Sequence, residues 1–158
     1  MDQNLAPLDA NYFVVQRMAE RGVSCVLGTV EDPLFGPVVS FGISGPVIEL
    51  LGDWSYRIPP LDGQTVSAMI REVKSSPLLF GYRGAEPIDV AAVEELIAKV
   101  AALQNDLPEV SSLELSLVIA GSSGATVLTA AARVARIKDP RPDSFVRRMP
   151  DLVTTLPE

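Results

Sequence analysis

The chain has 158 residues, which is the size of one domain or of one large piece of a multidomain protein. Hydrophobic residues make up 47% and charged residues 21% of the chain, so a sizeable core is expected and extended disorder is not. The formal net charge of −7 argues against a surface for nucleic acids or for anionic membranes.

Two residue types narrow the chemistry further. The sequence contains no histidine, which excludes a Ser-His-Asp or Cys-His triad from this chain alone and leaves only oxygen ligands for a metal ion. The single cysteine, Cys25, lies in a strand-like context and is predicted to be a buried, inert thiol. Because the sequence shows neither a bilayer-length apolar run nor a signal peptide, we expect a cytoplasmic protein.

The first half of the chain carries β-strand signals. After a polar lead-in at residues 1–10, the segments 11–18, 23–30 and 36–43 are rich in β-prone side chains. Asp32, followed by a proline, marks the turn between the second and third segments. Since that turn is too short for a parallel crossover, the sequence predicts a three-stranded antiparallel meander.

The middle of the chain carries the helical signals. Residues 42–61 mix glycine, proline and short β-prone pieces, so we expect a loop and hairpin there rather than a regular element. Asp62 is predicted to cap a helix that begins at Gly63 or Gln64, and Asp89 is predicted to cap a second, longer helix.

The end of the chain completes the predicted sheet. Residues 113–120 and 126–136 are expected to be strands joined by the GSSG turn, and residues 139–158 a tail or interdomain linker. Antiparallel strands with two helices covering one face define an α+β fold, which we expect to occupy residues 11–138.

A glycine-containing stretch is the first candidate for a ligand site. Gly36, Gly42 and Gly45 would let backbone amides approach a phosphate closely, although glycines of this kind also punctuate hairpins. Trp54 and Tyr56, two positions apart, fit the packing face of one strand more simply than a base-stacking platform.

Around this stretch the chain resembles the C-terminal part of the ATP-grasp domain of NDP-forming acyl-CoA synthetases. The similarity extends over about residues 11–137 and is closest to actinobacterial members, several of which carry a fused GNAT acetyltransferase domain. It rests on five blocks, in this order: VVQRMAERGV, DPLFGPVVSFGISGPVIELLGD, YRIPPL, PLLFGYRGAEPIDVAAVEEL and LPEVSSLEL.

The resemblance implies descent from a known class of enzymes and a set of partner domains. ATP-grasp enzymes bind ATP between two α+β subdomains and activate a carboxylate through an acyl phosphate. In NDP-forming synthetases the phosphoryl group passes through a histidine of another domain before CoA takes the acyl group. The implied partners are therefore the remaining ATP-grasp half, a CoA-binding domain and a GNAT domain, and neither nucleic acid nor membrane. ATP or ADP and Mg²⁺ are implied for the intact protein, and no cofactor for the isolated chain.

The resemblance also implies nucleotide contacts from three places. These are a hinge strand beside the adenine, a glycine loop of the form F-G-x-G-G, and an acidic residue followed by an arginine. Ser44 replaces a glycine of that loop and would restrict the backbone if a positive φ were needed. The implied nucleotide-binding residues are Val15, Gln16 and Met18 in the hinge, Gly42, Ser44 and Gly45 in the loop, and Glu49 and Arg57 beyond it.

At the metal site the chain departs from the family pattern. The family has D-x-N-P on one strand and L-D-A-R on the next, and the asparagine and the second aspartate bind magnesium. Ser116 stands at the asparagine position and Ala131 at the aspartate position. Glu114, on the same strand face as Ser116, is the only candidate substitute ligand that we identify.

These observations favour a degenerate, catalytically inactive ATP-grasp subdomain with a structural or ligand-sensing role in a larger acyl-CoA synthetase-like or GNAT acetyltransferase protein. One alternative is a part of an active, ATP- and Mg²⁺-dependent acyl-CoA synthetase that uses Glu114 or absent segments for the metal. Another alternative is a stand-alone interaction module, which would form a homo-oligomer through exposed apolar surface.

Overall fold

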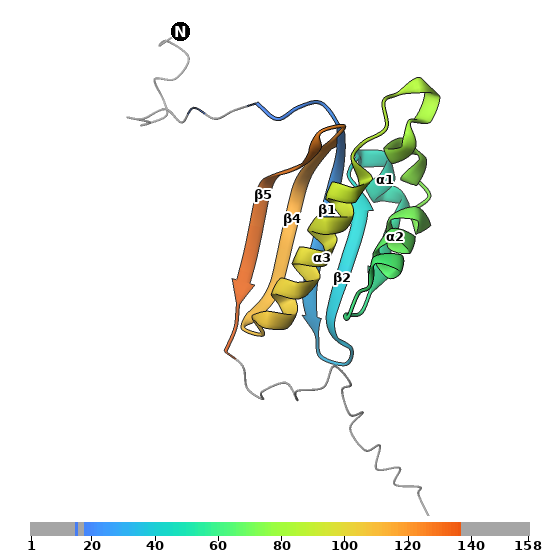
Figure 1. The fold of residues 1–158 in the computed structure, drawn as a ribbon. Helices are drawn as coiled ribbons and strands as arrows, with labels where there is room; N and C mark the ends of the chain where they lie inside the picture. The colour runs from blue at the N-terminus through green and yellow to red at the C-terminus, as the bar shows by residue number, and fades with distance from the viewer. Residues whose placement is uncertain (1–14, 16–17, 137–158) are drawn as a thin grey trace, which may run out of the picture.

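The computed structural model describes residue 15 and residues 18–136 and contains one five-stranded sheet, three α-helices and two short 3-10 helices (Figure 1). In chain order the elements are β1 (Val23–Asp32), β2 (Gly36–Ile43), α1 (Pro46–Leu51), β3 (Trp54–Arg57), α2 (Gly63–Glu72), η2 (Ser76–Phe80), η3 (Tyr82–Gly84), α3 (Val90–Asp106), β4 (Val110–Gly121) and β5 (Gly124–Val134).

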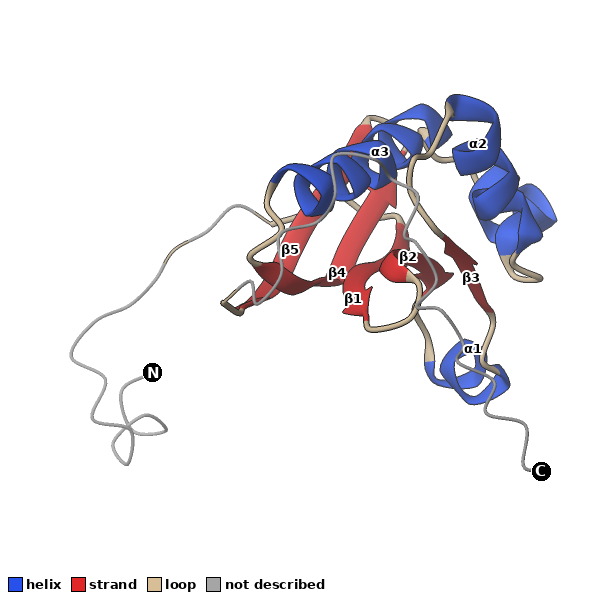
Figure 2. Ribbon diagram, turned by 90° about the horizontal axis from the view of Figure 1, so that it is seen from below, coloured by secondary structure: helices blue, strands red, loops and turns tan. Residues whose placement is uncertain are grey.

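The sheet has the strand order β3-β2-β1-β4-β5, and every neighbouring pair is antiparallel. Helices α2 and α3 lie on one face of it, whereas the short helix α1 lies on the other side (Figure 2). This arrangement confirms the predicted α+β fold, a mainly antiparallel sheet with two covering helices. No helix among the described residues is both long and apolar enough to cross a membrane.

Strand alternation gives the two faces of the sheet different roles. Cys25 and Leu27 of β1 and Val39 and Phe41 of β2 are fully buried and point toward the helices. The helices add buried side chains to the same core: Val66, Met69 and Ile70 of α2, and Val93, Ile97 and Val100 of α3. We call this side of the sheet the covered face and the opposite side the open face.

The predicted starts of both covering helices are confirmed. The Asp62 carboxylate accepts a hydrogen bond from the backbone N–H of Thr65 at 2.7 Å, and that of Asp89 from Ala92 at 3.1 Å. Each cap satisfies a backbone donor that the helix itself leaves without a partner. The prediction for Cys25 also agrees with the structure, because the thiol is buried and burial raises its pKa to about 12.

The stretch expected to be a loop and hairpin was predicted wrongly in part. It contains the helix α1 and the strand β3, which pairs with β2 at the edge of the sheet and was not among the predicted strands. Helix α1 is six residues long and β3 four, so neither is long enough to show a clear period in the sequence. The strand expected at residues 11–18 lies outside the described residues except for Val15 and Met18, which are not in a strand.

The final hairpin has different boundaries from the predicted ones. β4 runs from Val110 to Gly121 and is longer at both ends than predicted, whereas β5 runs from Gly124 to Val134 and begins and ends two residues earlier than predicted. The tight turn accounts for the early start of β5, since Gly121 pairs with Gly124 and only two residues lie between them. Gly124 has a φ of +137°, a conformation that favours glycine.

A buried hydroxyl on the covered face gives a test of this packing. The side chain of Thr29 is 4% exposed, and its Oγ1 has no hydrogen-bond partner among the described residues. Because an unpaired buried hydroxyl costs free energy, Thr29→Val is expected to leave the free energy of unfolding unchanged or to raise it by about 1 kcal/mol. Urea unfolding measures the change.

The matched control for this substitution is Ser55→Ala. Ser55 is 1% exposed, and its hydroxyl donates to the Glu72 carboxylate at 2.9 Å, so this change is expected to lower the free energy of unfolding by about 1–2 kcal/mol. A loss of stability in Thr29→Val as large as in Ser55→Ala would contradict the assignment of Thr29 as unpaired.

Candidate functional site

The register of the sheet brings five residues into one row on the open face. Gly28 of β1 pairs with Ser40 of β2 and with Glu114 of β4, Ser40 pairs with Tyr56 of β3, and Glu114 pairs with Ala131 of β5. The sequence neighbours of Gly28 and Ser40 are buried under the helices, so the row itself points to the open face. Glu114 and Ala131 are therefore direct cross-strand neighbours on this face.

β4 is irregular at the predicted metal position. On β1, Cys25 and Leu27 are two positions apart, whereas their β4 partners Val118 and Leu115 are three apart. All four side chains are buried on the covered face, so one residue of the pair Ser116–Leu117 is extra and forms a β-bulge. Bulges re-aim side chains and are over-represented beside active sites, which makes this point of β4 a natural place for a functional residue.

The residues at this point do not fit a magnesium ion held by the protein. Magnesium prefers carboxylate oxygens in near-octahedral geometry, and the only carboxylate here is the exposed side chain of Glu114. Ala131 offers no oxygen, and Ser116 offers only a neutral hydroxyl. Among the described residues, no group of three or more His, Cys, Asp or Glu side chains could hold a metal ion.

A cavity of about 380 Å³ lies at the end of the sheet where β4 turns into β5. Its walls include Met18, one of the predicted hinge residues, together with Ile119 and Leu128. Ile119 points to the open face, because the residues on either side of it in β4 are buried on the covered face. The cavity thus places one of the predicted hinge residues beside the open face.

The other predicted hinge residues are not brought together with Met18. Val15 is 95% exposed, and Gln16 lies outside the described residues. The nucleotide contacts expected of all three stay predictions.

The glycine loop has an unexpected neighbour. Gly42 pairs with Trp54, and a Cβ at Gly42 would lie 2.8 to 3.1 Å from three carbons of the indole six-membered ring. Three nearly equal distances mean that the flat side of the ring lies against the glycine. Phe41 is buried on the covered face, so this contact is on the open face. Gly42 therefore accommodates an indole, and its contact with a nucleotide stays a prediction.

The remaining loop positions show no strained backbone. The positive-φ glycines of the described chain do not include Gly45, and Ser44 is not among its positive-φ residues either. The replacement of a family glycine by Ser44 is thus compatible with the local conformation. Glu49 lies in α1, and its side chain is outside the described part of the chain.

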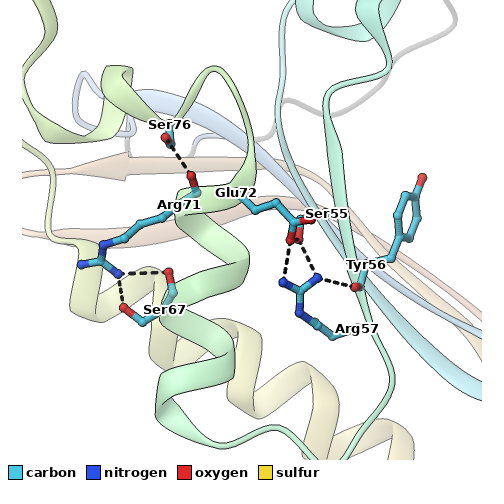
Figure 3. A network of polar contacts seen from close by, with 7 residues as sticks. All are labelled: Ser55, Tyr56, Arg57, Ser67, Arg71, Glu72 and Ser76. Atoms are coloured by element: carbon cyan, nitrogen blue, oxygen red, sulfur yellow. Dashed lines mark hydrogen bonds and ion pairs between the residues drawn. The ribbon is translucent and has the colours of Figure 1, made fainter.

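Arg57 is directed away from the open face. Its Nη2 atom lies 2.5 Å from the Glu72 carboxylate of α2, and its Nη1 donates to the Ser55 hydroxyl at 3.4 Å and to the Tyr56 carbonyl at 2.8 Å (Figure 3). Ser55 and Arg57 share the covered side of β3, whereas the Tyr56 side chain points the other way. The structure therefore separates Arg57 from Glu114 and Ala131, and its role as a nucleotide ligand stays a prediction.

Sequence reasoning missed this polar network. Ser55 and Glu72 are far apart in the sequence, and nothing in the spacing of α2 indicates that Glu72 faces β3. The only available signal is the alternation in WSYR, where Ser55 and Arg57 fall on one side of a strand and the two aromatic residues on the other.

The family comparison identifies the class of protein to which this fold and cavity belong. Residues 2–134 match the family model described as an ATP-grasp domain, so this chain belongs to the ATP-grasp domain family. Within that family it is similar to the ATP-grasp region of ADP-forming acyl-CoA synthetases.

The curated relatives are larger than this chain. It is 35% identical over 117 residues to the β subunit of acetate–CoA ligase (ADP-forming) I of Pyrococcus furiosus, covering 74% of this chain and 50% of the relative. It is 38% identical over 115 residues to acetate–CoA ligase (ADP-forming) I of Archaeoglobus fulgidus, of which it covers 17%. The chain thus spans about half or less of the length of these relatives.

Solved structures show the same fold. The coenzyme A complex of ACD1 from Ca. Korarchaeum cryptofilum has a TM-score of 0.73 and 37% identity, over 76% of this chain and 53% of that chain. The dinucleotide-forming acetyl-coenzyme A synthetase 1 of the same organism has a TM-score of 0.71 in its complex with coenzyme A and Mg-AMPPCP, in which the phosphohistidine segment points toward the nucleotide-binding site.

The ion pair on the covered side of β3 gives a pH-dependent prediction. Hydrogen bonds from Arg57 and then Ser55 hold the pKa of Glu72 below its ordinary value. Because the folded-state pKa is lowered, the stabilisation is present at neutral pH and is lost as the pH falls through the lowered pKa. We expect Glu72→Gln to be less stable than the wild type at neutral pH and equally stable in strong acid.

Urea unfolding at a series of pH values measures this difference. Glu95→Gln is the control, since Glu95 pairs only with Lys99 on an exposed helix surface and its loss should matter less. A stability difference for Glu72→Gln that stays constant into strong acid would contradict the assignment.

Proposed function

We propose that this chain is the C-terminal part of the ATP-grasp domain of a larger acyl-CoA synthetase-like protein, that its magnesium chemistry has been lost, and that it has a structural or ligand-sensing role. The observation that carries the proposal is the direct pairing of Glu114 with Ala131 beside the bulge at Ser116. A single carboxylate is left on the open face where two neighbouring strands would supply two metal ligands in the family.

The energetic consequence of this loss is large. A metal ion that neutralises the charge developing on a transferred phosphoryl group contributes several kcal/mol to transition-state stabilisation. A methyl group at position 131 contributes nothing to that charge balance. We therefore propose that the larger protein to which this chain belongs does not catalyse ATP-dependent ligation.

Nucleotide binding without catalysis is the ligand-sensing part of the proposal. The cavity at Met18 and Ile119 would take the base of ATP or ADP, and the open face from Ile119 to Glu114 would take the phosphates. Five steps along a strand cover roughly 16 Å, which is long enough for an extended nucleotide. The Mg-AMPPCP complex of the related synthetase supports a nucleotide on this fold.

A second candidate function is an active synthetase that uses Glu114 as the substitute metal ligand. The register favours it in one respect, because the longer glutamate side chain lies directly opposite Ala131 and can extend over the position of the missing aspartate. ADP formation by the intact protein that requires Mg²⁺ and disappears in Glu114→Gln would establish this alternative.

The partners of the chain are also proposals. The remaining ATP-grasp half and a CoA-binding domain follow from the resemblance and from the larger size of the relatives. A fused GNAT domain and a cytoplasmic location stay predictions. A stand-alone module that forms homo-oligomers is the weaker alternative, supported only by exposed apolar side chains such as Leu50 and Leu51 of α1.

Restoring the family ligands tests the proposed function. In the intact protein, the double substitution Ser116→Asn with Ala131→Asp is expected to make ATP binding depend on Mg²⁺, with an affinity gain of at least about tenfold on adding the ion. Isothermal titration with and without Mg²⁺ measures the gain.

The matched control is Ser116→Asn with Ala130→Asp. It adds the same groups, but position 130 is one residue along β5 and points to the other side of the strand. We expect no Mg²⁺-dependent gain from the control. An equal gain in both double variants, or none in the first, would mean that residues 116 and 131 are not the former metal ligands.

A further inference from the structure

Residues 18–22 are joined to the β4–β5 turn by a hydrogen bond between distant parts of the chain. The Glu20 Oε2 atom accepts a hydrogen bond from the Ser123 hydroxyl at 2.5 Å, and the two residues are 103 positions apart. Both residues are at the surface, so the bond is exposed to water.

The backbones at this junction approach each other closely. A Cβ on Gly22 would overlap the carbonyl oxygen of Ala120, and a Cβ on Gly121 would lie 3.3 Å from the carbonyl oxygen of Arg21. Val23, the next residue, pairs with Ala120 as the start of β1. The backbone at Arg21 and Gly22 therefore lies close against β4, and the contact of Glu20 with Ser123 continues this approach one residue further toward the N-terminus.

The same contact forms part of the cavity wall. Met18, Glu20 and Ser123 all line the cavity, together with Ile119 and Leu128 of the hairpin. Met18 is 89% exposed, so packing alone does not hold it in place. Glu20 lies only two residues from Met18, so its contact with Ser123 joins the Met18 side of the cavity to the hairpin side.

We propose that Glu20 and Ser123 form a latch that holds residues 18–20 against the β4–β5 turn and so shapes the cavity for an adenine nucleotide. The inference rests on the proposed function, because it concerns the same ligand and the same cavity. Glu20 and Ser123 act as positioning residues, since they set the place of Met18 in the wall and take no part in a reaction.

The latch should matter through preorganisation rather than through its own strength. Without it, a ligand would have to order residues 18–20 as it binds, and ordering of that kind lowers affinity. Because the ligand would have to restore the order that this one exposed hydrogen bond supplies, its removal is expected to weaken binding by about fivefold.

The test uses variants of the intact protein and two measurements. Ser123→Ala and Glu20→Ala remove the latch, Ser123→Thr keeps its hydroxyl, and Ser122→Ala is the matched control in the same turn. ATP and ADP affinities are measured by isothermal titration, and amide hydrogen exchange is measured at residues 18–22. We expect about fivefold weaker binding of both nucleotides and faster exchange in Ser123→Ala and Glu20→Ala, and wild-type behaviour in Ser123→Thr and Ser122→Ala.

The two measurements separate failure of the latch from failure of the proposed function. Unchanged affinity in Ser123→Ala while the wild type binds ATP would overturn the latch proposal, even if exchange becomes faster. Absence of ATP binding in the wild type would refute nucleotide binding by the proposed function. In that case exchange alone decides on the latch: faster exchange in Ser123→Ala than in Ser122→Ala supports it, and equal exchange overturns it.

Discussion

The antiparallel register of β4 is the constraint on which the rest of this structure depends. β4 lies between β1 and β5, so its register decides which residues of three strands share a face. The bulge at residues 116–117 keeps Leu115 and Val118 buried under the helices while Glu114 stays on the open face. A shift by one residue would place the Glu114 carboxylate in the core without a partner. The free energy cost of burying it would far exceed the free energy differences that arise from local strand propensity.

The two faces of the sheet differ in how they are packed. On the covered face, helices α2 and α3 bury apolar side chains, and Glu72 joins α2 to β3 through Arg57 and Ser55. On the open face, Gly28, Ser40 and Ala131 have small side chains that project little from the sheet, and the cavity lies beside the β4–β5 turn. Substitutions at positions 116 and 131 are therefore expected to leave the fold intact, since Ser116 and Ala131 are not among the core residues.

Much of the fold was predictable from local sequence signals, and the open face was not. The caps Asp62 and Asp89 and the strand alternation of β1 and β2 identify the helices, the sheet and the fold class. Helix α1 and strand β3 are too short to show a period. The side of β3 on which Arg57 lies follows from strand alternation, but its ion pair with Glu72 joins residues that are 15 positions apart and was not predictable. The pairing of Glu114 with Ala131 has the same register as the pairing of Gly121 with Gly124 at the turn. The irregular pairing of β4 with β1 has no such local signal, because no pattern in the sequence reveals a bulge.

The most direct test of the central claim is the effect of Mg²⁺ on ATP binding by the wild-type intact protein. If the open face binds a nucleotide through shape and hydrogen bonds alone, isothermal titration with Mg²⁺ and with EDTA should give the same dissociation constant. Tighter binding with Mg²⁺ by about tenfold or more, which corresponds to about 1.4 kcal/mol, would contradict the loss of magnesium chemistry at Ser116 and Ala131.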